Sequence, residues 1–231
     1  SSNTAGCSFQ ITVLDFPSPA TIVVDSISLC QITSTVVEAL PVTSGSGQWS
    51  VIAGQGTFNN PSANLTGVNN LNYGVNTMVW TISSASCGSL KDTVNIYVYQ
   101  NPLPASTLDT VLLCNQSLLN LSANVPLYGS GLWTTDLGAT ITDPTVATST
   151  ANGLAYGWNQ FIWTVTNGSC PATADTMHVY RAPVAQIYHS DTAICIENGA
   201  IDLNAISTIS GQSSMWMFIS GNGSISDPSS S

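Results

Sequence analysis

The chain has 231 residues, of which only 6% are charged, whereas an ordinary domain contains about 25% charged residues. Two cationic side chains, Lys91 and Arg181, stand against twelve carboxylates, so the formal net charge is -10. This balance leaves no basic surface for phosphate groups, which excludes nucleic acid as a partner. No apolar run reaches the roughly 20 residues that a membrane helix needs, so we expect no membrane insertion in this segment.

The sequence repeats with a period of about 83 residues. Residues 71–98 and 154–179 share Leu, Tyr-Gly, Asn, Trp-Thr, Cys and Asp-Thr in the same order. Trp80 and Trp163 are 83 positions apart, because 163 − 80 = 83, and other shared residues keep nearly the same offset. Self-similarity at a fixed period predicts tandem modules, each with its own small core.

The period divides the chain into four parts in order. Residues 1–19 match the end of the repeated stretch and predict the last strand of a preceding module. Residues 20–102 and 103–184 are two full modules, and 185–231 is the first half of a further, truncated module. Proline-containing junctions of two to four residues end strand pairing between the parts. Because both ends fall inside a module, we expect the chain to be a piece of a longer protein.

Within each module, turn signals separate short runs with strand periodicity. Residues 119–125 alternate apolar and polar side chains, and a Gly-Ser-Gly turn follows at 45–47 and 129–131. The following strands place tryptophan on their inward face, so we expect these four residues to form the cores: Trp49, Trp80, Trp133 and Trp163. Trp158, which replaces Val75 of the first module, is the better candidate for an exposed aromatic side chain.

The number and order of these elements indicate a fold class. About seven short strands per module, turn signals every 8 to 12 residues and the order Cys, Trp, Cys are typical of an immunoglobulin-like β-sandwich. We therefore predict an all-β chain of tandem immunoglobulin-like modules of about seven strands, arranged head to tail.

Six cysteines at repeating positions, in modules of about 80 residues, indicate structural disulfides and an oxidising compartment outside the cytoplasm. The first cysteine of a module, such as Cys30, falls between its first two strands, and the second, such as Cys87, in the turn before its last strand. These turns lie at opposite ends of a sandwich about 30 Å tall. A disulfide, however, needs Cα atoms within about 7 Å.

We therefore favour an inter-module disulfide between Cys30 and Cys170. The other four cysteines would have partners outside the fragment or, near its ends, none: Cys7, Cys87, Cys114 and Cys195. Pairing inside a module, Cys30 to Cys87 and Cys114 to Cys170, remains the alternative.

The second module also carries a wider pattern that resembles a known family, the PKD-like and Ig-like repeats of giant Bacteroidota cell-surface proteins. These include gliding-motility adhesins exported by the type IX secretion system. The residues that match are Cys114, Leu121, Ala123, Gly129, Gly131, Trp133, Leu154, Gly157, Asn159, Phe161, Trp163, Thr164, Gly168, Cys170, Asp175 and Thr176. The resemblance implies a PKD-like β-sandwich repeat at the cell surface.

Five Asp-Ser/Thr-apolar triplets resemble the acceptor of Bacteroidota O-glycosylation. The resemblance implies glycans on Ser26, Thr93, Thr110, Thr176 and Thr192. The alternative is that Asp-Thr simply opens a strand.

The sequence contains no recognisable catalytic or metal-binding motif. His178 and His189 are the only histidines, and HExxH and GxSxG motifs are absent. CxxC pairs and DxDxDG loops are absent as well. We predict no catalytic residue, no metal site and no cofactor.

These observations favour a non-enzymatic structural or adhesive segment of a large extracellular surface protein, which forms a stiff, disulfide-stabilised stalk or filament. Its expected partners are neighbouring modules of the same chain, with surface glycans, other cells and self-association into fibres as further candidates. One alternative is a glycan- or protein-binding module that uses inter-strand loops. Another is a spacer in a secreted multidomain hydrolase.

Overall fold

The computed structural model describes residues 15–85, 87–114, 116–182, 202–205, 213–217, 219–221 and 223–229. These residues form fourteen strands and no helix. They divide into two compact units, one reaching to Pro102 and including Thr166–Pro171, the other comprising Leu103–Val165 and the chain from Ala172 onward. Most of the expected last strand at 1–19, namely residues 1–14, lies outside the described residues, as does most of the expected half-module at 185–231.

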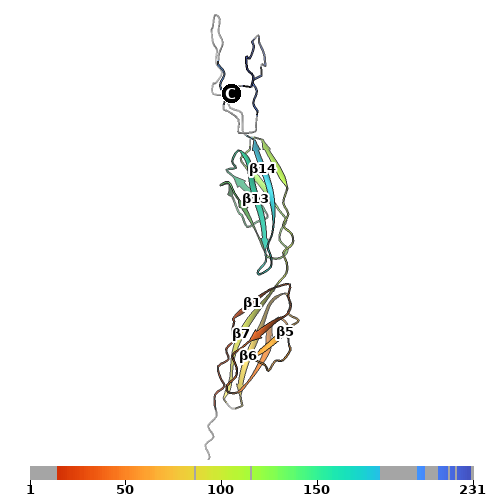
Figure 1. The fold of residues 1–231 in the computed structure, drawn as a ribbon, viewed down its shortest axis with the longest axis vertical. Coiled ribbons are helices and arrows are strands. Elements are labelled where there is room, and N and C mark those ends of the chain that lie inside the picture. Colours follow the sequence, from red (N-terminus) through yellow and green to blue (C-terminus); the bar gives the residue numbers. More distant parts are fainter. Residues whose placement is uncertain are drawn as a thin grey trace, which may run out of the picture. The chain divides into compact units, whose positions relative to one another are not determined.

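The first unit contains seven strands in two sheets (Figure 1). The four-stranded sheet has the order β1-β7-β6-β3 and the three-stranded sheet the order β2-β5-β4. The strands are β1 (Ser26–Cys30), β2 (Thr35–Glu38), β3 (Ser46–Ala53), β4 (Thr57–Phe58), β5 (Leu65–Asn69), β6 (Gly74–Ser84) and β7 (Gly88–Tyr99).

The second unit repeats this arrangement strand for strand. Its sheets have the orders β8-β14-β13-β10 and β9-β12-β11. The strands are β8 (Thr110–Cys114), β9 (Leu119–Ser122), β10 (Ser130–Thr135), β11 (Thr140–Ile141), β12 (Thr148–Asn152), β13 (Gly157–Thr166) and β14 (Thr173–Ala182).

The first extended segment of each unit contributes to both sheets. Ile22 bridges to Ala39 next to one sheet, and β1 then pairs in parallel with β7 in the other. Thr107 bridges to Ala123 in the same way before β8 pairs in parallel with β14. Seven strands in two sheets with this order are those of an immunoglobulin-like sandwich. The predicted fold class, tandem immunoglobulin-like β-sandwich modules, is confirmed.

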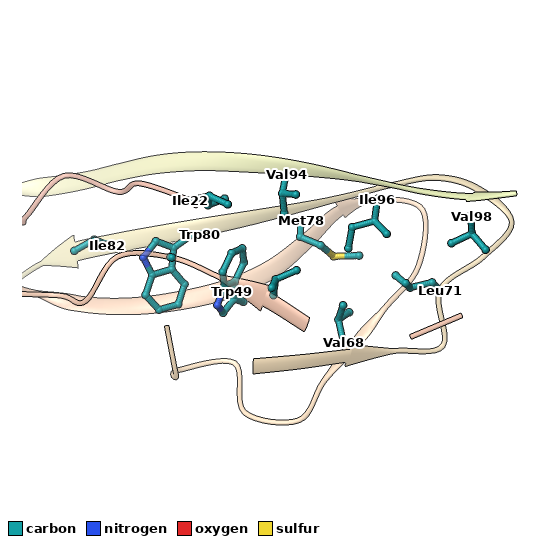
Figure 2. Packing of buried hydrophobic residues seen from close by; sticks show 12 residues of the cluster. Ile22, Trp49, Val68, Leu71, Met78, Trp80, Ile82, Val94, Ile96 and Val98 are labelled. Atoms are coloured by element: carbon teal, nitrogen blue, oxygen red, sulfur yellow. The ribbon is translucent and has the colours of Figure 1, made fainter. Parts of the chain in front are cut away.

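Each unit has its own core, centred on a pair of tryptophans. Trp49 and Trp80 are 1% and 0% exposed, with ring centroids 5.1 Å apart and planes at 44° (Figure 2). Trp133 and Trp163 have nearly the same geometry, 5.2 Å and 44°. The strands alternate, so every second residue of β6 and β13 enters the core. The predicted inward orientation of these four tryptophans is confirmed.

A buried asparagine organises the corner before β6 and before β13. Asn76 is fully buried, and its Oδ1 accepts hydrogen bonds from the backbone amides of Gln55 and Asn72. Asn159 holds its own corner in the same manner: its Oδ1 accepts from the Ala155 amide and its Nδ2 donates to the Ala155 carbonyl. The shared Asn is therefore a structural residue whose burial is offset by hydrogen bonds.

A third copy of one turn occurs near the end of the chain. The Trp49 amide donates to the Pro61 carbonyl, and the Trp133 amide to the Pro144 carbonyl. The Trp216 amide makes the same bond to the Pro228 carbonyl, at 2.7 Å. The three prolines belong to Asx-Pro-Ser/Thr triplets, in which the Asx side chain accepts from the amide of the third residue. The described part of the last copy thus repeats this turn of its predecessors.

Candidate functional site

The described residues contain a disulfide between Cys30 and Cys170, whose Cα atoms are 4.9 Å apart. Cys30 is the last residue of β1 and lies opposite Tyr99 at the end of β7. Cys170 lies in the turn between β13 and β14, within the stretch Thr166–Pro171 that is part of the first unit. This is the pairing favoured from the sequence, and it joins residues 140 positions apart.

Neither alternative pairing within a repeat copy is formed. Cys87 directly precedes the first residue of β7, whereas Cys30 lies beside its last residue. A strand of 12 residues separates these positions by about 40 Å. Cys114 occupies the position of Cys30 in the second copy, where it is exposed and carries a free thiol. Cys7 and Cys195 lie outside the described residues.

The turn that carries Cys170 is fixed to the end of β7 by further contacts. Asn167 Nδ2 donates to the carbonyl of Gln100 at 2.7 Å. Gly168 has a positive φ of 53° and packs against the Tyr99 ring so closely that a β-carbon would overlap it. Glycine is required here both by the backbone conformation and by the ring.

The same turn-to-backbone hydrogen bond occurs one period earlier. Ser84 stands 83 positions before Asn167, and its Oγ donates to the carbonyl of Asp15 at 3.2 Å. Asp15 precedes Pro17 by two residues, as Gln100 precedes Pro102. In both copies a polar side chain of the turn therefore donates to the backbone carbonyl of a residue that stands two positions before a proline. This contact could not be predicted from the sequence, where its only signal is a polar residue three positions before each turn cysteine.

The recurring Asp of the Asp-Thr pair has a structural role. Asp92 Oδ2 accepts from the Ile22 amide at 2.7 Å, and Asp175 Oδ2 accepts from the Thr107 amide at 2.7 Å. Each carboxylate also accepts from the amide of the residue that follows it. The hydrogen bond from the Thr107 amide lowers the pKa of Asp175, with desolvation acting against it. The Asp thus ties the first extended segment of a unit to its last strand.

The candidate glycosylation residues differ in accessibility. Ser26, Thr93 and Thr110 are exposed, whereas Thr176 is half-buried. Thr192 lies outside the described residues.

The second unit carries an exposed aromatic group near the start of β13. Trp158 is 57% exposed, as expected from the sequence, and its ring meets that of Tyr180 edge to face at 5.1 Å. The Arg181 guanidinium lies 4.2 Å from the Tyr156 ring centroid and donates to the Leu154 carbonyl. The first unit has Val75 in place of Trp158, so the two copies differ here.

No group of three or more His, Cys, Asp or Glu side chains is placed to hold a metal ion in the described part of the chain. Within the same residues, no helix has the length and apolar character required to cross a membrane.

No protein family model and no curated protein sequence matches this chain. Among solved structures, it is similar to the Sidekick-1 immunoglobulin domains 1–4, with 11% identity, 74% of this chain and 51% of that chain covered, and a TM-score of 0.47. The chain thus spans about half the length of that Sidekick-1 structure.

Two further structures show comparable values. A variant of titin domains I67–I69 has 11% identity, with 88% of this chain and 82% of that chain covered and a TM-score of 0.46. The fibronectin(III)-like modules of Clostridium thermocellum CbhA have 11% identity, 71% and 94% coverage and a TM-score of 0.39. The fold of this chain, tandem immunoglobulin-like sandwiches, is defined by its own strand order and pairing.

Proposed function

We propose that the chain is a non-enzymatic structural segment of a large extracellular surface protein, in which disulfides join successive modules into a stiff stalk. The observation that supports this most directly is the Cys30–Cys170 disulfide, because its two cysteines come from different copies of the repeat. We take residues 20–102 and 103–184 as the two full modules. A bond between copies limits how far they can separate or turn.

The repeated hydrogen bond from the turn supports disulfides between modules at further positions. Ser84 binds the Asp15 carbonyl as Asn167 binds the Gln100 carbonyl, so Cys87 stands where Cys170 stands in the next copy. We propose that Cys87 bonds to a preceding module and Cys114 to a following one. By the same offsets, Cys7 and Cys195 would join modules beyond the fragment.

A location outside the cytoplasm follows from the chemistry of the bond. Disulfides persist in oxidising compartments, and modules of this size often depend on them. Together with the resemblance to Bacteroidota surface repeats, this favours export by the type IX system. The exposed hydroxyls of Ser26, Thr93 and Thr110 would then be the accessible positions for O-glycosylation. An intact-mass measurement on protein from the native cell would detect added hexoses, and a mass equal to that of the bare chain would rule them out.

A stalk works through its length. The longest strand of the first module has 12 residues, which corresponds to about 40 Å per module. Small-angle X-ray scattering on recombinant chains of two, four and six modules tests this. We expect the maximum dimension to grow by about 40 Å for each added module. A maximum dimension that stays constant as modules are added would refute the stalk.

The role of the disulfide needs a separate comparison. In the double variant Cys30→Ser/Cys170→Ser, we expect both modules to stay folded while the distribution of dimensions in scattering broadens. The matched control is Cys114→Ser, which leaves the Cys30–Cys170 bond intact. Non-reducing peptide mapping must show the Cys30–Cys170 peptide in the parent chain. A Cys30–Cys87 peptide, or an unchanged distribution in the double variant, would contradict the proposed joint.

A further inference from the structure

Three side chains, exposed Trp158 and Leu112 with half-buried Tyr180 between them, lie in one row across the second module. In the register of the sheet, Trp158 of β13 lies opposite Tyr180 of β14, and Tyr180 lies opposite Leu112 of β8. Their neighbours along the strands, such as Asn159 and Val179, are buried, so the row faces away from the core. Trp158 and Leu112 are 57% and 71% exposed. The row therefore presents apolar surface to solvent.

The next row on the same face is polar. Two residues further along the same three strands, the register pairs Gln160 with His178 and His178 with Thr110. Neither row contains a carboxylate or an ammonium group. The nearby guanidinium of Arg181 is engaged with the Tyr156 ring and the Leu154 carbonyl. The face thus combines aromatic rings with hydrogen-bonding groups, and the Asp136 carboxylate beside it accepts a hydrogen bond from the Gln160 backbone amide.

The first module lacks this row at equivalent positions. There the register aligns Val75, Tyr97 and Ser28 across β6, β7 and β1. Only the tyrosine is shared by the two modules. Its neighbours Val75 and Ser28 are smaller than Trp158 and Leu112 of the second module. Since the two folds are otherwise alike, the fold does not require Trp and Leu at these positions. Their presence in one copy alone points to a role outside the core.

The size and chemistry of the row indicate one kind of occupant. Strands are spaced about 4.8 Å apart, so a row across three strands is about 10 Å long, the length of two pyranose rings. Stable protein interfaces bury about 800 Å² per partner from about 20 to 30 residues, which is more than three side chains supply. Amide, hydroxyl and imidazole groups beside an aromatic ring suit the hydroxyls and C–H face of a sugar.

We propose that the row formed by Trp158, Tyr180 and Leu112, with the polar row beside it, is a binding platform for a neutral glycan. The edge-to-face contact with Tyr180 holds the Trp158 ring, and the buried Asn159 fixes the corner from which β13 begins. Binding therefore orders few additional groups. The site lies on the sheet face of one module, does not depend on the stalk proposed above, and requires that Thr110 carries no O-linked glycan.

Isothermal titration calorimetry tests this with the full chain and three neutral probes, cellotetraose, laminaritetraose and N-acetylchitotetraose. We expect at least one to bind in a 1:1 ratio. Trp158→Val and Leu112→Ser introduce the residues of the first module, which that fold already accommodates. Each should weaken binding about tenfold or more, a change of about 1.4 kcal/mol. Val75→Trp with Ser28→Leu builds the row in the first module and should raise the ratio to two sugars per chain.

Circular dichroism and thermal melting of each variant establish that it is folded. Absence of binding to all three probes at millimolar concentration would overturn the proposal, as would unchanged affinity in folded Trp158→Val. Sedimentation of the parent chain adds a third criterion. If Trp158→Val abolishes self-association while no sugar binds, the row is a protein contact and the glycan assignment is wrong.

Discussion

Gly131 lies against the six-membered ring of the Trp163 indole, so close that a β-carbon on this glycine would overlap the ring atom Cζ2. Gly47 has the same relationship to Trp80 in the first module. The second glycine of each Gly-Ser-Gly turn is therefore fixed by packing, whereas the first, Gly45 or Gly129, is fixed by a positive φ.

Replacement of Gly131 by alanine should destabilise the second module by about 1 to 3 kcal/mol or more, since a well-packed core has no room for an added methyl group. Urea denaturation of the full chain, followed by tryptophan fluorescence, measures the shift of the transition. Ser130→Ala, in the same turn, is the control and should change stability by less than about 0.5 kcal/mol. Equal effects of the two substitutions would show that the indole can move aside.

Asn159→Ala should cost about 1 to 3 kcal/mol, because the amide and carbonyl of Ala155 lose their buried partner. Asn159→Asp retains an acceptor for the Ala155 amide but cannot donate, so we expect it to destabilise as well. Urea midpoints of both variants, with Gln160→Ala as the control on the next residue of β13, provide the comparison. Wild-type stability in Asn159→Ala would mean that the corner does not depend on this side chain.

The lowered pKa of Asp175 predicts that the free energy of unfolding depends on pH in the acid range. The hydrogen bond from the Thr107 amide lowers its folded-state pKa below the value of about 3.9 in an unfolded chain. The stability that it contributes is therefore present above about pH 4 and is lost as pH falls through the lowered pKa.

In the Asp175→Asn variant, the contribution of the carboxylate to stability is absent at every pH. The difference in urea midpoint between the parent chain and the variant should be largest near pH 7 and should shrink below pH 4. A difference that stays constant from pH 7 to pH 2.5 would exclude the carboxylate as its source.

Gly168→Ala should destabilise the turn that carries Cys170, because alanine is strained at a φ of 53° and its methyl group overlaps the Tyr99 ring. Tyr99→Ala should relieve the overlap but not the backbone strain. A double-mutant cycle of thermal midpoints separates the two terms, and we expect the double variant to be more stable than the sum of the single effects predicts. Strict additivity would mean that the ring and the glycine are not coupled.

The period of about 83 residues was sufficient to predict the modules, the strand count and the inward tryptophans, since these depend on local alternation and on repetition. The separation of Cys30 and Cys87 also followed, because the parity of the strands places the two turns at opposite ends. Residues that recur at this period could be aligned between the modules. Residues that alternate in polarity along a strand could be assigned to its inner or outer face.

Other contacts could not be predicted, because they join positions far apart in sequence. The Asp92 carboxylate reaches the Ile22 amide 70 residues earlier, and Ser84 reaches the Asp15 carbonyl 69 residues earlier. Such bonds depend on which strands become neighbours, which residue patterns do not specify. The recurrence of Asp, and of Asn76 and Asn159, showed only that these positions matter. The burial and the hydrogen bonds of these side chains are determined only when the strands are paired into sheets.

The parallel pairing of β1 with β7 has a mechanical consequence. Ser26 lies opposite Asn95 and Cys30 opposite Tyr99, so the chain enters along one edge of the sheet and leaves beside it in the same direction. A pulling force on the two ends of the module loads these pairings in shear. Several hydrogen bonds must then break together, whereas an antiparallel terminal pair would unzip one bond at a time. A module with this pairing therefore opposes tension along its strands with several hydrogen bonds at once.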